Sequence, residues 1–200
     1  MSAIRLDRIY PIIFNRKYMK SIKKNGHYFE PILDSVVYFL EANFKVKQDF
    51  RVISAAEIRS GRLPREVLWK NAMDNLYRIL KVHWSENKTY AYISSLPRQF
   101  GAAAILHPLI HDQLRENFGD SYIILPYSST EIVVVQSEDA SGLLEAYREE
   151  LKEVPAKWEL SKNIYIADKG IITAYPETQS QDIIPLITNN HKRRKHYGTA

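Results

Sequence analysis

The stretch from Gly119 to Gln136 constrains the fold more than any other part of the chain. Two runs rich in Val, Ile and Tyr, at 122–125 and 132–135, flank a short polar segment. Such residues suit a pleated surface, and short apolar runs bounded by turn residues are typical of strands buried on both faces. Pro126 is expected to end the first strand, because proline cannot donate to a central ladder. The sequence therefore predicts a central β-hairpin around which the other elements pack.

The polar loop of this hairpin is the predicted binding site. Its candidate residues are Tyr127, Ser128, Ser129, Thr130 and Glu131. The hydroxyl side chains can bond the loop backbone, and polar groups on rigid strands recognise a partner at low ordering cost. A carboxylate buried without a partner costs several kcal/mol, so Glu131 should be exposed to a basic partner or paired within the fold. A purely structural hairpin is the alternative interpretation.

The remaining segments predict short strands and about three main helices. Strands are expected at 8–14, 35–42, 50–54, 88–94, 163–167 and 171–175. Helices are expected at 65–80, 99–118 and 141–154, where apolar residues recur with the helical period. The fold class is therefore α+β, with an antiparallel-rich sheet of hairpins. Residues 1–187 are expected to form a single domain and residues 188–200 a basic, flexible tail.

The positive charge of the chain is concentrated in its first half. Residues 1–100 hold 18 Lys and Arg against 9 Asp and Glu, whereas residues 101–200 hold 10 against 14. The basic residues that could contact nucleic acid are Lys17, Lys20, Lys23 and Lys24, together with Lys192, Arg193, Arg194 and Lys195 of the tail. Tyr18 interleaves with the first group, as in surfaces that bind nucleic acid weakly. A solvated, mobile loop at 15–25 is the alternative.

Several classes of chemistry are excluded by what the sequence lacks. The chain has no cysteine, which removes disulfides, thiolate metal sites and a cysteine nucleophile. It has no GxGxxG, P-loop or GxSxG motif. Its start carries Arg5, Asp7 and Arg8 instead of a signal peptide's apolar core, and no run approaches the roughly 18 apolar residues of a membrane span. We therefore expect a cytoplasmic protein with no cofactor and no membrane contact.

His107 and His111 are the candidate metal ligands. A four-residue spacing on a helix places two imidazoles on one face, which is the geometry that zinc sites use. However, no Glu follows the first histidine as in HExxH, and the sequence indicates no third ligand. The alternative interpretation is that both side chains lie at the boundary of the hydrophobic core.

A set of short motifs runs through most of the chain in a fixed order. These motifs are Arg8–Ile13, a strand pair at 35–54, a helix over Val67–Leu80 that contains Asn75-Leu76, a helix that contains Ile105-Leu106, and the central hairpin. Their order resembles the YtpQ-like family of uncharacterised bacterial proteins over residues 8–175. Members of that family typically carry a histidine in the hairpin loop, where this chain has Tyr127 and Thr130. The resemblance implies a fold, but no activity or cofactor.

Three function hypotheses follow from these observations. The first is a non-enzymatic intracellular binding module, such as an adaptor, a regulator or an immunity-type protein, with a protein partner. The second is a nucleic-acid-binding accessory protein that uses the basic residues above. The third is a metal-dependent hydrolase built around His107 and His111.

Overall fold

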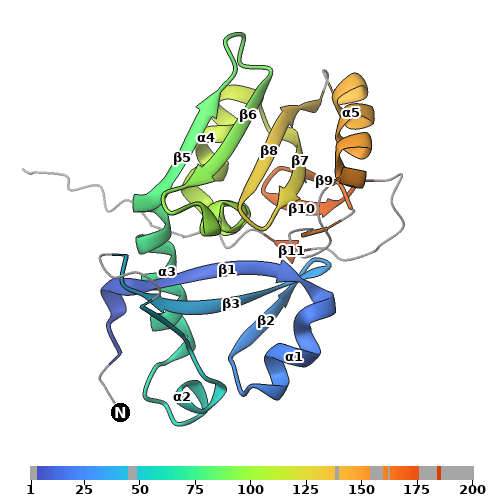
Figure 1. Cartoon of the computed structure of the whole chain (residues 1–200). Coiled ribbons are helices and arrows are strands. Elements are labelled where there is room, and N and C mark those ends of the chain that lie inside the picture. The colour runs from blue at the N-terminus through green and yellow to red at the C-terminus, as the bar shows by residue number, and fades with distance from the viewer. Residues whose placement is uncertain are drawn as a thin grey trace, which may run out of the picture.

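The computed structural model describes residues 4–44, 49–137, 140–153, 160–161, 163–175 and 184–185. These residues form helices and two antiparallel sheets, so the predicted α+β class is confirmed. The two sheets lie one above the other in Figure 1. The predicted basic tail, residues 188–200, lies outside the described residues.

The smaller sheet has four strands and comes from the first part of the chain. Its strands are β1 (Ile9–Asn15), β2 (Phe29–Ile32), β3 (Ser35–Ala42) and β4 (Phe50–Val52). The order is β1-β3-β2, and β4 pairs with the end of β3. This pairing confirms the hairpin predicted for 35–42 with 50–54. Pro11 lies in β1, which pairs with β3 alone among the described strands, as expected of a strand that contains proline.

The larger sheet has seven strands and contains the central hairpin. Its strands are β5 (Leu80–Trp84), β6 (Tyr90–Ser95), β7 (Ser121–Ser128), β8 (Glu131–Gln136), β9 (Tyr165–Asp168), β10 (Ile171–Ala174) and β11 (Ile184–Pro185). Their order is β11-β10-β9-β7-β8-β6-β5. The hairpin of β7 and β8 is thus central, as predicted, and the last predicted hairpin turns at Gly170 with a φ of 82°.

One strand was missed where a helix was expected to continue. The predicted helix over 65–80 is α3 (Arg65–Ile79), and Leu80 is already extended, with φ −75° and ψ 147°. Residues 80–84 then form β5 at the end of the larger sheet. The pattern of LKVHW alternates between apolar and polar residues, which is the signal of a strand.

The predicted helix over 99–118 is divided in two at a proline. Its first part is the 3-10 helix η3 (Arg98–Leu106), and its second part is α4 (Pro108–Phe118). His107 between them is extended, with φ −95° and ψ 114°. A residue before proline is disfavoured in the helical region, because the proline ring clashes with it. One continuous helix was therefore the wrong expectation.

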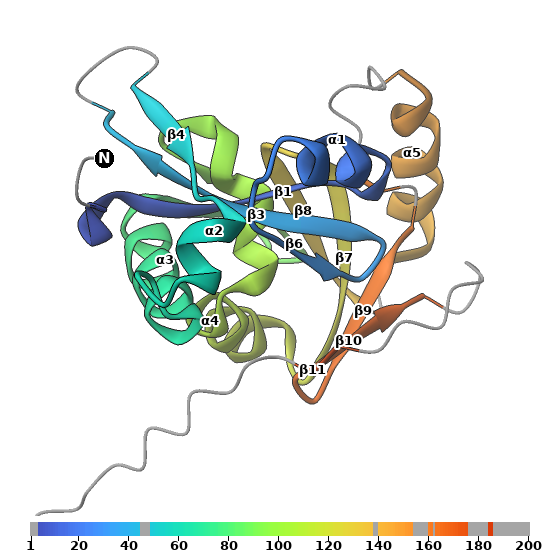
Figure 2. The same cartoon turned by 90° about the horizontal axis from the view of Figure 1, so that it is seen from below.

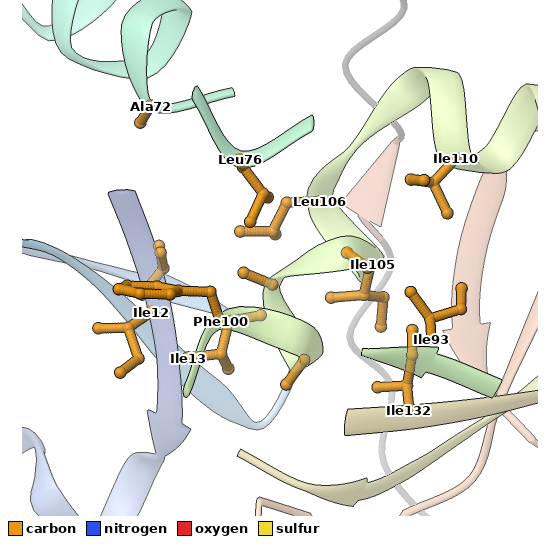
Figure 3. Close-up of a cluster of buried hydrophobic side chains, with 14 of the residues drawn as sticks. Ile12, Ile13, Ala72, Leu76, Ile93, Phe100, Ile105, Leu106, Ile110 and Ile132 are labelled. Atoms are coloured by element: carbon orange, nitrogen blue, oxygen red, sulfur yellow. The ribbon is translucent and has the colours of Figure 1, made fainter. Parts of the chain in front are cut away.

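The two sheets share a hydrophobic core in which η3 is the central element. Every residue from Phe100 to Leu106 is buried. In Figure 3, Phe100 lies beside Ile12 and Ile13 of β1, while Ile105 lies toward Ile93 and Ile132 of the larger sheet. Buried apolar area contributes about 25 cal/mol per Å², so this joint core holds the two sheets together as one body.

Helices cover the two faces of the larger sheet unequally. α4 packs Ile110, Leu114 and Phe118 into the main core, on one side of the sheet. On the other side α5 (Ala140–Glu153), which confirms the predicted helix over 141–154, packs Leu144 and Tyr147 into a second cluster. Figure 2 shows α4 and α5 on opposite sides of the strands. Among the helices of the described residues, none has the length and apolar character of a membrane span.

Candidate functional site

The tip of the central hairpin holds the residues predicted to bind a partner. β7 continues through Pro126 to Ser128, so the proline does not end the strand as predicted. The register shifts between Leu125 and Ser128, and this irregularity accommodates a residue that has no backbone N–H. The turn itself is only Ser129 and Thr130.

The two serines of the predicted loop are internal. Ser128 and Ser129 are 8% and 5% exposed. The Ser128 hydroxyl accepts the backbone N–H of Thr130 at 3.1 Å, which confirms the predicted bonding of the loop to itself. The carbonyl of Thr130 lies against Gly101 of η3, so close that a Cβ on Gly101 would be 1.9 Å from the carbonyl oxygen. The two serines therefore offer no hydroxyl to a partner.

Tyr127 and Glu131 lie on the face of the sheet opposite to the main core, and both are half-buried. The Tyr127 ring packs against Tyr147 of α5 at a centroid distance of 6.2 Å. The Tyr92 phenol in β6 donates a hydrogen bond to Oε2 of Glu131. Burial, and then this bond to the carboxylate, raises the pKa of Tyr92 to about 12. Glu131 is thus paired within the fold, which was one of the two alternatives predicted for it.

Glu131 belongs to a surface whose other residues were not predicted from the sequence. On β5, β6 and β8, alternate residues point away from the main core, whereas Ala91, Ile93, Ile132 and Val134 point into it. The outward residues also include Tyr90 and the buried Val135, which packs in the second cluster. We call the remaining outward set the open face. Its residues are Lys81, His83, Tyr92, Ser94, Glu131 and Val133.

The open face is half-exposed or fully exposed at each of its positions. His83 is opposite Tyr92, and Tyr92 is opposite Val133, so the three side chains form one row across the strands. α5 packs over β7 beside this row, and Figure 1 shows α4 behind β5 and β6. Within the described ranges, no helix covers the near side of these two strands.

The chemistry of the open face suits recognition. The rings of His83 and Tyr92 are 5.8 Å apart, and Nε2 of His83 is 3.3 Å from the Ser94 hydroxyl. A serine beside an imidazole resembles a nucleophile and its base, but a catalytic histidine is oriented by an acceptor at its other nitrogen. Among the described residues no carboxylate bonds Nδ1 of His83, so the pair lacks that third group.

The two candidate metal ligands do not lie in one helix. His107 precedes α4 and caps it, because its Nδ1 accepts the backbone N–H of Leu109 at 3.2 Å. Its Nε2 is 3.2 Å from the carbonyl of Met73, to which it donates. The two histidines were predicted to lie in one helix, but only His111 does, because His107 precedes Pro108 and is extended.

His111 is also fully engaged within the fold. Its Nε2 donates to the Ile105 carbonyl at 2.9 Å, and its Nδ1 accepts the hydrogen of the Tyr122 phenol at 2.5 Å. Burial lowers the pKa of His111 to about 4 and lowers that of His107 as well, so both rings are neutral at pH 7. At 4% and 2% exposure they lie inside the core rather than at its boundary. No group of three potential metal ligands occurs in the part of the chain that the structure describes.

The described residues include a small cavity between the two sheets. Its volume is about 10 Å³, which is room for about one water molecule. Its lining is almost entirely apolar and comes from Ile13, Ile32, Leu33, Ser35, Ile105, Pro126, Leu160, Ser161 and Tyr165. Small-molecule sites typically offer about 300–1,000 Å³ and several convergent polar groups. We therefore interpret this cavity as packing space between the sheets.

The predicted nucleic-acid residues of the first half lie far from the open face. Lys17, Lys20, Lys23 and Lys24 are exposed on a helical segment between β1 and β2. The tail residues Lys192, Arg193, Arg194 and Lys195 are outside the described residues. No protein-family model, no curated protein and no solved structure matches this chain, so the resemblance to the YtpQ-like family stays a prediction.

Proposed function

We propose that this protein is a non-enzymatic intracellular binding module that recognises a protein partner through its open face. The observation that carries the proposal is the hydrogen-bonded pair of Tyr92 and Glu131 on a sheet surface without a covering helix in the described residues. An adaptor, a regulator or an immunity-type protein would use such a surface.

The pair is preorganised for recognition. Tyr92 holds one oxygen of Glu131, and Oε1 of the same carboxylate accepts no hydrogen bond from the described residues. Both residues are in central strands of the sheet, so little side-chain entropy remains to be lost on binding. Tyrosine is enriched at protein interfaces because its ring supplies apolar area and its hydroxyl a polar contact. The partner that fits is a protein segment with Lys or Arg opposite Glu131 and an apolar side chain opposite Val133.

The hydrolase hypothesis has less support than the binding hypothesis. It requires His107 and His111 to bind a metal, yet all four ring nitrogens have partners inside the protein. A metal would have to displace buried hydrogen bonds and leave their donors or acceptors unpaired. The open face needs no such rearrangement, because its polar groups already lie at the surface.

A charge reversal on the open face tests the proposal. A photo-crosslinking residue at Tyr90, which is 42% exposed beside this face, identifies the partner in the native host. Glu131→Lys should then weaken binding of the purified partner at least tenfold, and its thermal midpoint should fall by about 3–6 °C for the lost bond to Tyr92, so binding is measured well below that midpoint. Glu66→Lys makes the same charge change on the exposed side of α3 and should bind normally. Equal binding by the parent protein and Glu131→Lys would exclude the open face as the site.

A further inference from the structure

The segment between β1 and β2 carries the densest exposed positive charge of the described residues. Residues 8–29 contain six Lys and Arg and no Asp or Glu. This segment folds into the 3-10 helix η2 (Arg16–Tyr18) and the helix α1 (Met19–Lys24). The alternative interpretation from the sequence, a mobile loop at 15–25, is therefore wrong. We call its exposed basic residues the basic ledge. They are Arg16, Lys17, Lys20, Lys23 and Lys24.

Three lysines of the basic ledge lack the internal counter-charge that several other cations of the fold have. Elsewhere Arg51 binds Glu41 and Glu57, and Arg65 binds Glu30. Within the described ranges, no carboxylate lies within ion-pair distance of Lys20, Lys23 or Lys24. These three ammonium groups therefore keep their full attraction for an anionic partner, because no internal counter-charge offsets it.

Aromatic rings adjoin the basic ledge. Phe14 at the end of β1 stacks on Tyr38 of β3, with centroids 5.1 Å apart and an interplanar angle of 20°. The Tyr18 ring meets Phe14 edge-on at 6.2 Å, and Nζ of Lys17 lies 5.4 Å from the centre of the Tyr18 ring. Tyr18 and Phe14 are half-buried, so each still presents part of its ring to solvent.

We propose that the basic ledge binds single-stranded nucleic acid, with its lysines on the phosphates and a base stacked at Tyr18. Proteins that hold single strands combine a positive track with aromatic rings on which bases stack. A duplex hides the faces of its bases, and α1 has only six residues, so it is too short to follow a major groove. Lys20, Lys23 and Lys24, which have no carboxylate within ion-pair distance among the described residues, follow the partly exposed Tyr18 ring directly in the chain, and this arrangement favours a single strand.

The basic ledge is independent of the open face. α1 lies beside the smaller sheet in the lower part of Figure 1, whereas β5, β6 and β8 lie in its upper part. One molecule has room to hold a protein partner and a nucleic acid at the same time. Loss of one activity therefore does not predict loss of the other.

Fluorescence anisotropy of the full chain with a labelled 20-nucleotide oligo-dT tests the proposal. The variant Lys20→Gln/Lys23→Gln/Lys24→Gln should bind at least about tenfold more weakly at 50 mM salt. The slope of log K against log salt should become shallower by about 2, because each phosphate contact on a single strand contributes about 0.7. The variant Lys70→Gln/Lys152→Gln/Lys169→Gln removes three exposed lysines elsewhere and should bind as the parent protein does.

Two further variants separate stacking and the tail from the basic ledge. Tyr18→Leu should weaken binding about fivefold or more without changing the salt slope, because stacking contributes about 1–3 kcal/mol per base. Substitution of Lys192, Arg193, Arg194 and Lys195 by Gln should leave the effect of the basic-ledge variant in place. Binding that depends on the tail alone, a preference for a matched duplex, or a preference for vesicles with anionic lipid would each overturn the proposal.

Discussion

Tyr165 of β9 donates the hydrogen of its phenol to the carboxylate of Asp34, which lies 131 positions earlier in the turn between β2 and β3. The Ser161 hydroxyl and the Asn163 amide donate to the same carboxylate, at 2.5 and 3.1 Å. The Asp34 carboxylate thus joins the smaller sheet to β9 of the larger sheet and to the residues just before β9. Burial, and then the charge of Asp34, raises the pKa of the Tyr165 phenol, which therefore stays a donor across the physiological range.

Removal of the Asp34 carboxylate should loosen the contact between the two sheets. Asp34→Ala removes an acceptor that four donors share, those of Ser35, Ser161, Asn163 and Tyr165, and hydrogen bonds to a charged group are each worth about 1.5–3 kcal/mol. We expect the free energy of unfolding to fall by about 2–4 kcal/mol in urea titrations. Asp7→Ala breaks an exposed pair with Arg5 and should cost far less. Equal losses in both variants would show that Asp34 does not join the sheets.

Gly101→Ala should displace the tip of the central hairpin. The new Cβ would meet the Thr130 carbonyl at 1.9 Å, and backbone cannot move aside as a flexible side chain does. Overpacking of a core typically costs about 1–3 kcal/mol, and we expect about 2 kcal/mol or more here. Gly26→Ala is the matched control, because it meets nothing within 4 Å and adds only the strain of a φ of 72°, about 1 kcal/mol. A smaller loss for Gly101→Ala than for Gly26→Ala would contradict the close packing.

Local sequence patterns predict correctly those elements whose limits depend on residues near them in the chain. Gly170 sets the turn between β9 and β10, and the apolar period sets α3. Two departures from the predicted elements also have causes in the local sequence. Pro108 forces His107 out of the helix, and the alternation in Leu80–Trp84 marks a strand.

The division into two sheets and the open face depended on contacts that no local pattern encodes. The partner of Asp34 is 131 residues away, and burial of Ser129 follows from packing of the tip on Gly101. Tyr90, Tyr92 and Ser94 alternate visibly along a predicted strand. Tertiary packing alone decides how much of the outward side of the sheet α5 covers and how much it leaves exposed.

His111 should make the stability of the protein depend on pH above the range of carboxylate titration. Burial holds its pKa at about 4 in the folded state, against 6.5 for an ordinary histidine. The unfolded chain therefore binds a proton that the folded chain does not, and stability falls as the pH falls from 6.5 towards 4. Between pH 6.5 and 5 this loss is about 2 kcal/mol, at 1.36 kcal/mol per pH unit.

Replacement of His111 isolates this contribution. His111→Gln should be less stable than the parent protein at pH 7, but it should lose about 2 kcal/mol less between pH 7 and pH 5 in urea titrations. Tyr122→Phe removes a bonding partner and keeps the histidine, so its pH dependence should remain. His107, whose pKa burial also lowers, is present in all three proteins and cancels from the comparison. The same pH dependence in His111→Gln and the parent would refute the assignment.

Glu30 should stabilise the smaller sheet at neutral pH and cease to do so in acid. Its carboxylate accepts a forked pair of bonds from Arg65, at 2.9 and 2.5 Å, and a bond from the Trp69 indole at 2.7 Å. Burial alone would raise the pKa of Glu30, but hydrogen bonds from Arg65, Tyr28 and Trp69 outweigh it and hold the pKa below its usual 4.5. A lowered carboxyl pKa contributes stability above pH 4.5 that is lost as the pH falls through the folded-state value.

Glu30→Gln tests this linkage, because it keeps an acceptor for the phenol and the indole while it removes the charge that Arg65 binds. We expect a loss of about 1–2 kcal/mol at pH 7 that shrinks as the pH falls below 4.5 and the parent protein loses the same charge. Asp74→Asn removes the exposed partner of Lys70 and should cost less than about 0.5 kcal/mol at either pH. The stability of Arg65→Lys at pH 7 should lie between that of the parent protein and that of Glu30→Gln, because an ammonium group cannot match both carboxylate oxygens at once. A deficit in Glu30→Gln that does not shrink at any pH below 4.5 at which the parent protein still folds would mean that lost packing, and not the ion pair, causes it.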